Sequence, residues 1–401
     1  MTWTILAALS LAIWLYLLLF RGGFWRADQR LGTPAPAPDP WPAVAAIVPA
    51  RDEAEVIGRA LGSVLTQDYP GPLHIVVVDD HSRDGTAEEA RVAAQASARG
   101  EHFELVQARA LPPAWTGKLW ALAEGQSRAQ AAMPEARYFW FTDGDIEHDP
   151  TTLRRLVAKA DGDALDLVSL MASLSCEGFW ARLLIPPFVF FFQKLTPFPW
   201  VNDPRKATAA AAGGCILVDA QALDAAGGLA SIKGALIDDC ALARAIKTEG
   251  RVRGRGIWLG LATDSRSIRP YQGLGAIWEM VARCAYTQLR HSPVRLAGTL
   301  LAMALTYVVP PVVALGAPLH GQAPAAVLGL AAWGLMTGAF WPTLKLYCQP
   351  PWLAPLLPLA ALFYGAMTLD SALRHGRGKG GAWKGRVQTS TGTVEPPSRG
   401  G

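Results

Sequence analysis

The hydrophobic residues of this chain form two kinds of segment, short strand-length runs and much longer apolar blocks. From residue 43 to residue 141, short apolar runs such as LHIVVV alternate with helix-length stretches. Continuous runs of this kind are typical of strands that are buried on both faces of a parallel sheet. Strands alternating with helices predict a parallel-sheet α/β domain. We expect strands over 44–48, 73–78, 103–106 and 138–141, and helices over 55–65, 86–98 and 118–131.

The first long apolar block, residues 4–20, contains no charged residue and is near the lower length limit for a membrane-spanning helix. Arg21, Arg26 and Arg30 follow it, and no small-residue cleavage site does. The pattern predicts an uncleaved anchor over residues 1–21, with the next domain in the cytosol. The proline-rich stretch 33–42 predicts a stiff linker.

Three further apolar blocks, 296–319, 323–344 and 352–369, are each long enough to span a membrane. Three crossings after a cytosolic domain would leave the C-terminus outside. Basic residues in the tail 373–401 favour the cytosol instead, so the proline-interrupted third block could be re-entrant or interfacial. The basic residues are Arg374, Arg377, Lys379, Lys384 and Arg386.

Composition supports a membrane protein. Of the 401 residues, 51% are hydrophobic and 17% are charged, whereas about 25% are charged in an ordinary soluble domain. The net charge of +4 is too small to indicate a nucleic-acid partner. The five cysteines are scattered without a C-x-x-C pair, which indicates neither a zinc site nor a disulfide framework and fits a reducing cytosol.

The most informative polar motif follows the expected strand 138–141, where Asp143 and Asp145 flank a glycine. Ligands of open α/β sheets collect outside the carboxyl ends of the strands. Two carboxylates there repel each other unless a cation lies between them. A divalent metal carrying a diphosphate suits such a place. The alternative is a turn whose carboxylates only satisfy backbone amides.

Two more motifs follow expected strands. VPARDE (48–53) ends the first strand, and DDHSRDGT (79–86) follows the second. An arginine and carboxylates at such ends can hold a nucleotide, and Asp79 or Asp80 could accept from a uracil imide or a ribose hydroxyl. The alternative for both motifs is turn and helix-cap chemistry.

Two motifs open expected helices. Lys118 in WTGK lies where the helix dipole disfavours a cation, and a bound phosphate would compensate. Asp239 in LIDD could remove a proton from an acceptor hydroxyl if it lies within reach. A solvated lysine and a helix cap are the alternatives.

Other patterns carry no site. The glycines of 254–260 have the wrong spacing for a dinucleotide fingerprint, and no strand is expected before them. A basic run between 244 and 255 is more typical of a solvated or lipid-facing surface. It comprises Arg244, Lys247, Arg251, Arg253 and Arg255.

The ordered set VPARDE, VVDDHSRDGT, TGK, TDGD and IDD, followed by apolar blocks, resembles the family-2 glycosyltransferases. Within their membrane-bound branch, which includes ceramide glucosyltransferase, WTGKLWAL, CAYTQLRHSP and WKGR are most similar to the hopanoid-associated type. The likeness covers about residues 40–390. It implies a GT-A fold over residues 41–290, which is an α/β domain with a mixed, mostly parallel sheet that binds a nucleotide sugar. It also implies transmembrane helices over 296–372. It also implies a nucleotide-sugar donor (a UDP-sugar foremost), Mg²⁺ or Mn²⁺, and inversion at the anomeric carbon.

The resemblance also implies roles for particular residues. Asp239 would be the catalytic base, and Asp145 the main metal ligand together with Asp143. The donor-binding residues would be Pro49, Arg51, Glu53, Asp79, Asp80, Lys118 and Asp143. The family's Q-x-x-R-W motif is absent in that form. The nearest candidates for diphosphate or acceptor contacts are Asp238, Arg283, Gln288 and Arg290.

The acceptor is expected to be a membrane lipid. The catalytic domain is expected at the cytosolic face of a bacterial inner membrane. The apolar, aromatic segment 179–200 is broken by two prolines and flanked by tryptophans, which favours an interfacial position. A hydrophobic helix packed on the domain is the alternative. Rival functions are a polyprenyl-phosphate glycosyltransferase, a processive polysaccharide synthase and a non-catalytic membrane scaffold.

Overall fold

The computed structural model describes residues 1–32, 36–377, 387–389 and 392–394, and it divides into two compact units. The α/β unit comprises residues 29–175 and 200–270 together with the tail from 382. The helical unit comprises residues 1–28, 176–199 and 271–381. The α/β unit therefore differs from the predicted range 41–290, because 176–199 and 271–290 belong to the helical unit.

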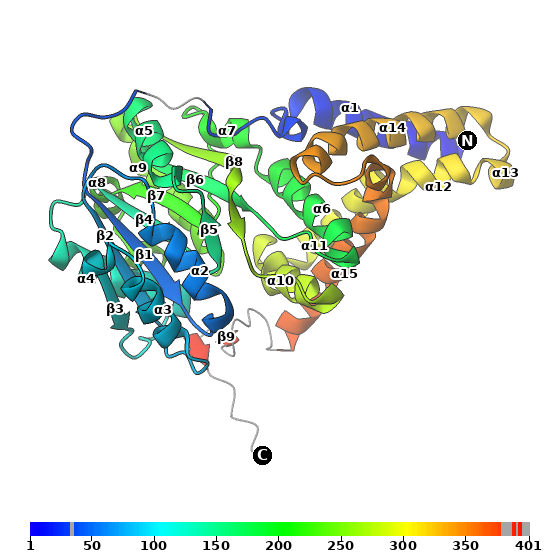
Figure 1. Ribbon diagram of the computed structural model, residues 1–401. Helices are drawn as coiled ribbons and strands as arrows, with labels where there is room; N and C mark the ends of the chain where they lie inside the picture. The colour runs from blue at the N-terminus through cyan, green and yellow to red at the C-terminus, as the bar shows by residue number, and fades with distance from the viewer. Residues whose placement is uncertain (33–35, 378–386, 390–391, 395–401) are drawn as a thin grey trace, which may run out of the picture. The chain divides into compact units, whose positions relative to one another are not determined.

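The α/β unit is built on an eight-stranded sheet in the order β3-β2-β1-β4-β7-β6-β8-β5 (Figure 1). Strands β3, β2, β1 and β4 run parallel, β7 is antiparallel to both of its neighbours, and β8 is parallel to β6. The predicted mixed, mostly parallel sheet is confirmed. Its strands are β1 (Val44–Ala50), β2 (Leu73–Asp79), β3 (Phe103–Gln107), β4 (Tyr138–Thr142), β5 (Ile146–His148), β6 (Leu165–Ser173), β7 (Cys215–Asp219) and β8 (Gly256–Ser267).

Helices connect these strands, and the three helices predicted in the first half are confirmed with ends shifted by up to three residues. Strands β1, β2 and β4 are almost wholly buried, as their continuous apolar runs predict. The strands β5 to β8 were not predicted, and β8 begins at Gly256, inside the rejected glycine pattern. The helices are α2 (Ala54–Leu65), α3 (Thr86–Gln95), α4 (Gly117–Ala132), α5 (Thr152–Gly162), α8 (Ala220–Ala225) and α9 (Asp238–Arg253), with 3-10 turns η2 (Gly100–His102) and η3 (Leu229–Ile232).

The basic run between 244 and 255 is partly engaged in internal contacts. The ammonium of Lys247 donates to the carbonyl oxygens of Val201 and Thr208 at 2.6 and 2.7 Å. Arg253 and Arg255 both pair with the buried carboxylate of Asp166. Lys247 and Arg255 are therefore engaged within the fold, whereas Arg244, Arg251 and Arg253 are exposed, as expected for the solvated surface predicted from the sequence.

His148 ties three strands together beneath the turn 143–145. Its Nε2 lies 2.7 Å from Thr142 Oγ1 at the end of β4, and its Nδ1 lies 2.9 Å from Ser265 Oγ on β8. The ring is 3% exposed, and burial lowers the pKa of His148 to about 3. A neutral imidazole thus serves as a fixed hydrogen-bonding bridge in the sheet.

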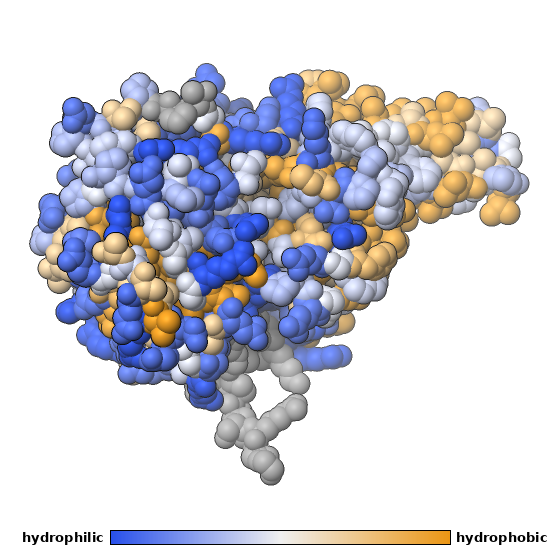
Figure 2. Space-filling view, in the orientation of Figure 1, coloured by the Kyte–Doolittle hydropathy of each residue, from blue (hydrophilic) through white to orange (hydrophobic). Residues whose placement is uncertain are grey.

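The helical unit contains four helical stretches, among the described residues, that are long and apolar enough to cross a membrane. They are residues 2–20, 293–315, 323–346 and 351–376. Figure 2 shows hydrophobic residues gathered over α1, α12 and α14. The unit's elements are α1 (Thr2–Phe20), η1 (Phe24–Arg26), α6 (Phe179–Leu195), α10 (Gly273–Gln288), α11 (Pro293–Met303), the π-helical η4 (Ala304–Val308), α12 (Val309–Leu315), α13 (Ala317–His320), α14 (Ala323–Leu346), η5 (Pro351–Leu356) and α15 (Leu357–Gly376).

The sidedness predicted from the basic tail stays a prediction. Lys379, Lys384 and Arg386 lie outside the described residues. Arg374 is described, and it pairs with Glu279 of α10 and with Asp370 of its own helix. The remaining elements are α7 (Phe198–Asn202) and two short tail strands, β9 (Val387–Thr389) and β10 (Gly392–Val394).

The prediction that prolines break the segment 179–200 is wrong, because α6 continues through Pro186 and Pro187. Both prolines are buried, and the hydroxyl of Tyr364 on α15 donates to the carbonyl oxygen of Leu184 at 2.8 Å. An outside donor of this kind satisfies backbone groups near prolines in apolar surroundings. Residues 179–195 form a helix packed within the helical unit, not on the α/β unit as the alternative interpretation had it, and the interfacial position stays a prediction.

The neutral state of His148 predicts acid sensitivity. Its folded pKa lies below the usual 6.5, so the unfolded state binds the extra proton first and stability falls as the pH decreases from about 6.5 towards 3. The loss is about 1.4 kcal/mol for each pH unit in that window. Thermal unfolding of the detergent-solubilised chain between pH 4 and 8 measures it. His148→Gln should be less stable at pH 8 yet lose less stability on acidification; equal losses in both proteins would contradict the prediction.

Candidate active site

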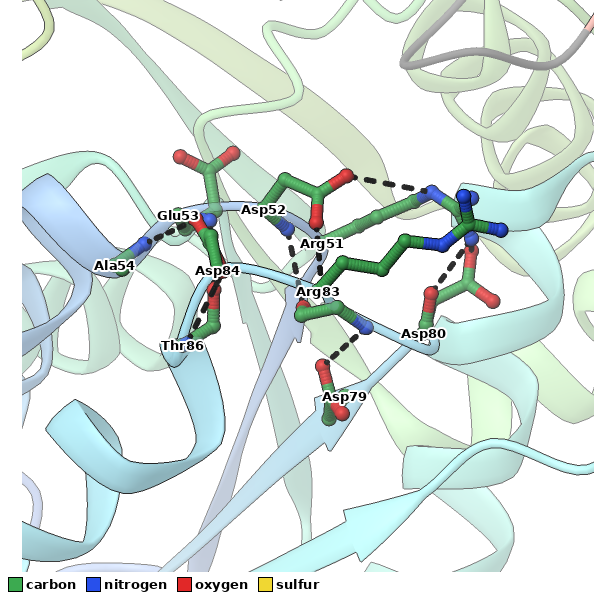
Figure 3. A network of polar contacts seen from close by, with 10 residues as sticks. Arg51, Asp52, Glu53, Ala54, Asp79, Asp80, Arg83, Asp84 and Thr86 are labelled. Atoms are coloured by element: carbon green, nitrogen blue, oxygen red, sulfur yellow. Dashed lines mark hydrogen bonds and ion pairs between the residues drawn. The ribbon is translucent and has the colours of Figure 1, made fainter. Parts of the chain in front are cut away.

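The turns that follow β1 and β2 interlock through side chain–backbone hydrogen bonds (Figure 3). Arg51 Nη1 donates to the carbonyl oxygen of Asp80 at 2.7 Å. The amide of Asp52 donates to Ser82 Oγ at 3.0 Å, and the amide of Arg83 donates back to Asp52 Oδ1 at 2.9 Å. Because these bonds run in both directions, the two turns form one rigid edge at the carboxyl ends of neighbouring parallel strands.

Two residues of these turns adopt backbone conformations that non-glycine residues rarely adopt. Asp52 has φ of 50° and His81 has φ of 57°. Such positions cost energy and persist where the surrounding structure fixes them, commonly at ligand sites. The interlocking bonds supply that constraint here.

Asp84 serves the local structure. It accepts hydrogen bonds from Ala54 N at the start of α2 and from Thr86 N at the start of α3, at 3.0 and 3.1 Å. Desolvation would raise the pKa of Asp84, but the hydrogen bonds from Thr86 and Ala54 outweigh it and hold the pKa below its usual value. The turn chemistry considered from the sequence therefore applies to this residue.

The residues predicted to bind the nucleoside come together at this edge. Arg51 is 6% exposed and its guanidinium lies 3.7 Å from Asp80 Oδ2, so it positions the turn. Asp79 Oδ1 accepts from the amide of Ser82 at 3.1 Å. Their contacts with a donor stay predictions.

A second group of predicted residues meets in a narrow pocket at the end of β4. Lys118 Nζ lies 2.7 Å from Asp143 Oδ1 and 3.7 Å from Asp238 Oδ2. Thr116 Oγ1 caps α4 by accepting from Leu119 N at 3.3 Å, which sets Lys118 in the first turn of the helix. The pocket is lined by Lys118, Leu119, Leu122, Phe141, Thr142, Asp143, Gly213, Ile216, Leu229, Ile232, Asp238, Asp239 and Leu242.

Electrostatics in this pocket suit proton transfer. Burial and the neighbouring Asp238 raise the pKa of Asp239 to about 6, although Lys118 acts to lower it. Burial alone would lower the pKa of Lys118, but Asp143, Asp238 and Asp239 outweigh it and raise that pKa above its ordinary value. At neutral pH the pocket therefore holds a permanent ammonium ion beside a carboxylate able to accept a proton.

Gly213 is a site residue that the sequence reasoning missed. Its amide donates to Asp239 Oδ2 at 3.0 Å. A Cβ at this position would lie 2.9 Å from Lys118 Nζ and 3.5 Å from Asp239 Oδ2. The Gly213–Gly214 pair before β7 was the available signal, since glycine in such a place often marks a close approach of other groups.

Asp145 is held by the end of β8, in contacts that the sequence did not indicate. Ser267 Oγ donates to Asp145 Oδ2 at 2.8 Å, and the amide of Ile268 donates to the carbonyl oxygen of Asp145 at 2.9 Å. Arg269 Nε lies 3.9 Å from Asp145 Oδ2, and Arg269 Nη2 pairs with Glu53 Oε2. The available signal was the run of polar residues that ends β8.

The donor set fits a metal that arrives with a phosphate-bearing ligand. Among the described residues, no group of three or more His, Cys, Asp or Glu side chains could form a metal cage. Asp143 and Asp145 offer carboxylate oxygens on one turn, each close to a basic side chain. Mg²⁺ is commonly bound through one or two carboxylates, with substrate phosphates completing its coordination.

Of the candidates for diphosphate or acceptor contacts, Asp238 lines the pocket, and the other three belong to the helical unit. Arg283 and Gln288 lie on α10, and Arg290 follows it. Their roles stay predictions.

Residues 45–215 match the glycosyl transferase family 2. The fold is of the GT-A type, and these findings support a transferase with a family-2 glycosyltransferase domain.

Individual relatives are distant. Glycosyltransferase AglE of Haloferax volcanii is 32% identical over 128 residues, which span 32% of this chain and only 38% of AglE. The mannosyltransferase PcManGT from Pyrobaculum calidifontis, solved with GDP-Man and Mn²⁺, is 22% identical with a TM-score of 0.53, covering 93% of this chain and 98% of PcManGT. That likeness concerns the fold alone. S. aureus TarS 1-349 with UDP-GlcNAc is 13% identical with a TM-score of 0.36, covering 89% of this chain and 97% of the TarS chain. This likeness is too weak to support a conclusion.

The close approach at Gly213 predicts a specific sensitivity. Gly213→Ala places a methyl group against Lys118, which Asp143 holds in place, and should destabilise the protein by about 1–3 kcal/mol, the usual effect of overpacking. Gly62→Ala on α2 is the matched control, because no heavy atom lies within 4 Å of its added Cβ. The control should stabilise the protein by up to about 1 kcal/mol. Thermal unfolding compares them, and equal stability of the two variants would refute the expected clash.

Proposed function

We propose that this chain is an inverting, metal-dependent glycosyltransferase that moves a sugar from a nucleotide sugar to a membrane lipid. The observation that carries the proposal is the pocket at the end of β4. There, Lys118, Asp143 and Asp239 meet from three separate segments, and Asp145 lies on the same turn as Asp143.

The donor would bind along the interlocked edge and the turn 143–145. Glu53, Asp79 and Asp80 would hold the nucleoside, with Arg51 positioning that edge, and Lys118 would contact the diphosphate. A UDP-sugar is our first candidate. PcManGT, which has the same fold type, was solved with a GDP-sugar and Mn²⁺, so GDP-sugars belong in the same test.

The chemistry is a single displacement at the anomeric carbon. A Mg²⁺ or Mn²⁺ ion held by Asp145 and Asp143 would supply positive charge next to the leaving diphosphate. Lys118 adds a fixed ammonium charge in the same pocket, which stabilises negative charge as it develops. Asp239 accepts the proton of the attacking hydroxyl, and Gly213 N and Cys240 N orient its carboxylate.

The lipid acceptor is supported by the four helical stretches long enough to span a membrane. We place the α/β unit at the cytosolic face of a bacterial inner membrane, since nucleotide sugars are cytosolic and basic residues follow the first apolar helix. A role in hopanoid lipid metabolism rests on the resemblance of WTGKLWAL and CAYTQLRHSP; the supporting WKGR at 383–386 lies outside the described residues.

Asp239 and Asp145 are expected to be essential for transfer. Asp239→Asn removes the base and should lower kcat by about 10²–10⁴-fold, and Asp145→Asn should abolish the transfer that depends on divalent cations. Asp163→Asn is the control, because Asp163 is an exposed partner of Lys159 on α5. Membranes are incubated with a panel of UDP- and GDP-sugars and Mn²⁺, and the lipid extract is examined by mass spectrometry. Full transfer by Asp239→Asn would refute the assignment of the base, and transfer only to polyprenyl phosphate or a growing polysaccharide would select a rival acceptor.

The raised pKa of Asp239 predicts the pH dependence of transfer. The base works only when deprotonated, so kcat/KM should rise as the pH increases through about 6 and level off above 7. Initial rates between pH 5 and 8.5 at saturating Mn²⁺ measure the profile. Residual activity of Asp239→Asn should lack this rise; an identical profile in the variant would assign the titration to another group.

A further inference from the structure

Glu53 and Asp145 are brought together by the packing of two turns. Gly144, between the two aspartates, lies against the turn after β1: a Cβ there would be 3.5 Å from the carbonyl oxygen of Pro49 and 3.7 Å from Glu53 Cγ. Both carboxylates are mostly shielded, with side chains 11% and 21% exposed. Like charges this close need a counter-cation.

Arg269 provides that counter-cation. Its Nη2 pairs with Glu53 Oε2, and its Nε lies 3.9 Å from Asp145 Oδ2. The two preceding residues, Ser267 and Ile268, hydrogen-bond to the side chain and backbone of Asp145, so the end of β8 is fixed to the turn. The guanidinium is therefore held beside the carboxylate to which the proposed function assigns the metal.

We propose that Arg269 is a resident counter-cation that a divalent metal must displace from Asp145, so that metal and nucleoside diphosphate bind cooperatively. The inference rests on the proposed function and adds to it a residue and a coupling between metal and nucleotide.

The cooperativity follows from charge balance. A divalent ion at Asp145 places two positive charges next to the guanidinium, so the metal alone binds against electrostatic repulsion. A diphosphate reverses the balance, because its oxygens attract both the metal and an arginine, whose planar fork suits phosphate. Each ligand then strengthens the binding of the other by the same factor.

The test compares Arg269→Gln with Arg266→Gln. Arg266 is the matched control because it lies on β8, three residues before Arg269, and forms the same type of ion pair, with Nε 2.6 Å from Glu147 Oε2. Full-length proteins in detergent are titrated with Mn²⁺, and bound ion is followed by electron paramagnetic resonance. Each titration is done without nucleotide, with UDP and with GDP.

In the wild type and Arg266→Gln, UDP or GDP should tighten Mn²⁺ binding by about 5- to 150-fold, the usual range for coupled sites. Arg269→Gln should bind Mn²⁺ alone more tightly and lose most of the tightening by nucleotide. Arg269→Lys keeps the positive charge and should keep the weak binding of Mn²⁺ alone, which separates the charge effect from a folding defect.

Two results would overturn the inference, and they are distinguishable. Nucleotide-coupled Mn²⁺ binding that is identical in wild type, Arg269→Gln and Arg266→Gln would make Arg269 an ordinary structural ion-pair residue while leaving the proposed function intact. Failure of all proteins to bind Mn²⁺ with either nucleotide would refute the proposed function itself.

Discussion

Charge balance among converging carboxylates is the constraint on which the candidate site depends. Acidic side chains from the ends of β1 and β4 and from the start of α9 meet because the sheet brings those segments together. Lys118 and Arg269 neutralise them from two sides. Burial, together with the neighbouring Asp238, raises the pKa of Asp239. Arrangements of perturbed titratable groups in a pocket are characteristic of functional sites.

The surrounding structure keeps these charges in position. Hydrogen bonds join the turns after β1 and β2, His148 ties β4 to β8 next to the turn 143–145, and Gly213 leaves space for Lys118 beside Asp239. None of these interactions takes part in a chemical step. They limit the motion of carboxylates that would otherwise separate by repulsion, which is the usual role of supporting contacts around a site.

The helical unit follows a different rule. Its exposed surface is apolar over α1, α12 and α14, and polar contacts such as that from Tyr364 to the carbonyl of Leu184 lie inside it, close to two prolines within a helix. In apolar surroundings each unsatisfied backbone group is costly, which is why polar groups of neighbouring helices commonly lie close to prolines inside a helix.

The sequence by itself determined the parallel half of the sheet, the long apolar helices and the acidic motifs at strand ends, because local periodicity and strand-end chemistry express these directly. It failed at β5 to β8, where antiparallel pairing and charged strand ends obscure the pattern, and at α6, where packing overrides proline. Only the tertiary structure decided that Gly213, Ser267 and Arg269 join the site. Their contacts join residues far apart in the sequence, and such contacts leave no local periodic signal.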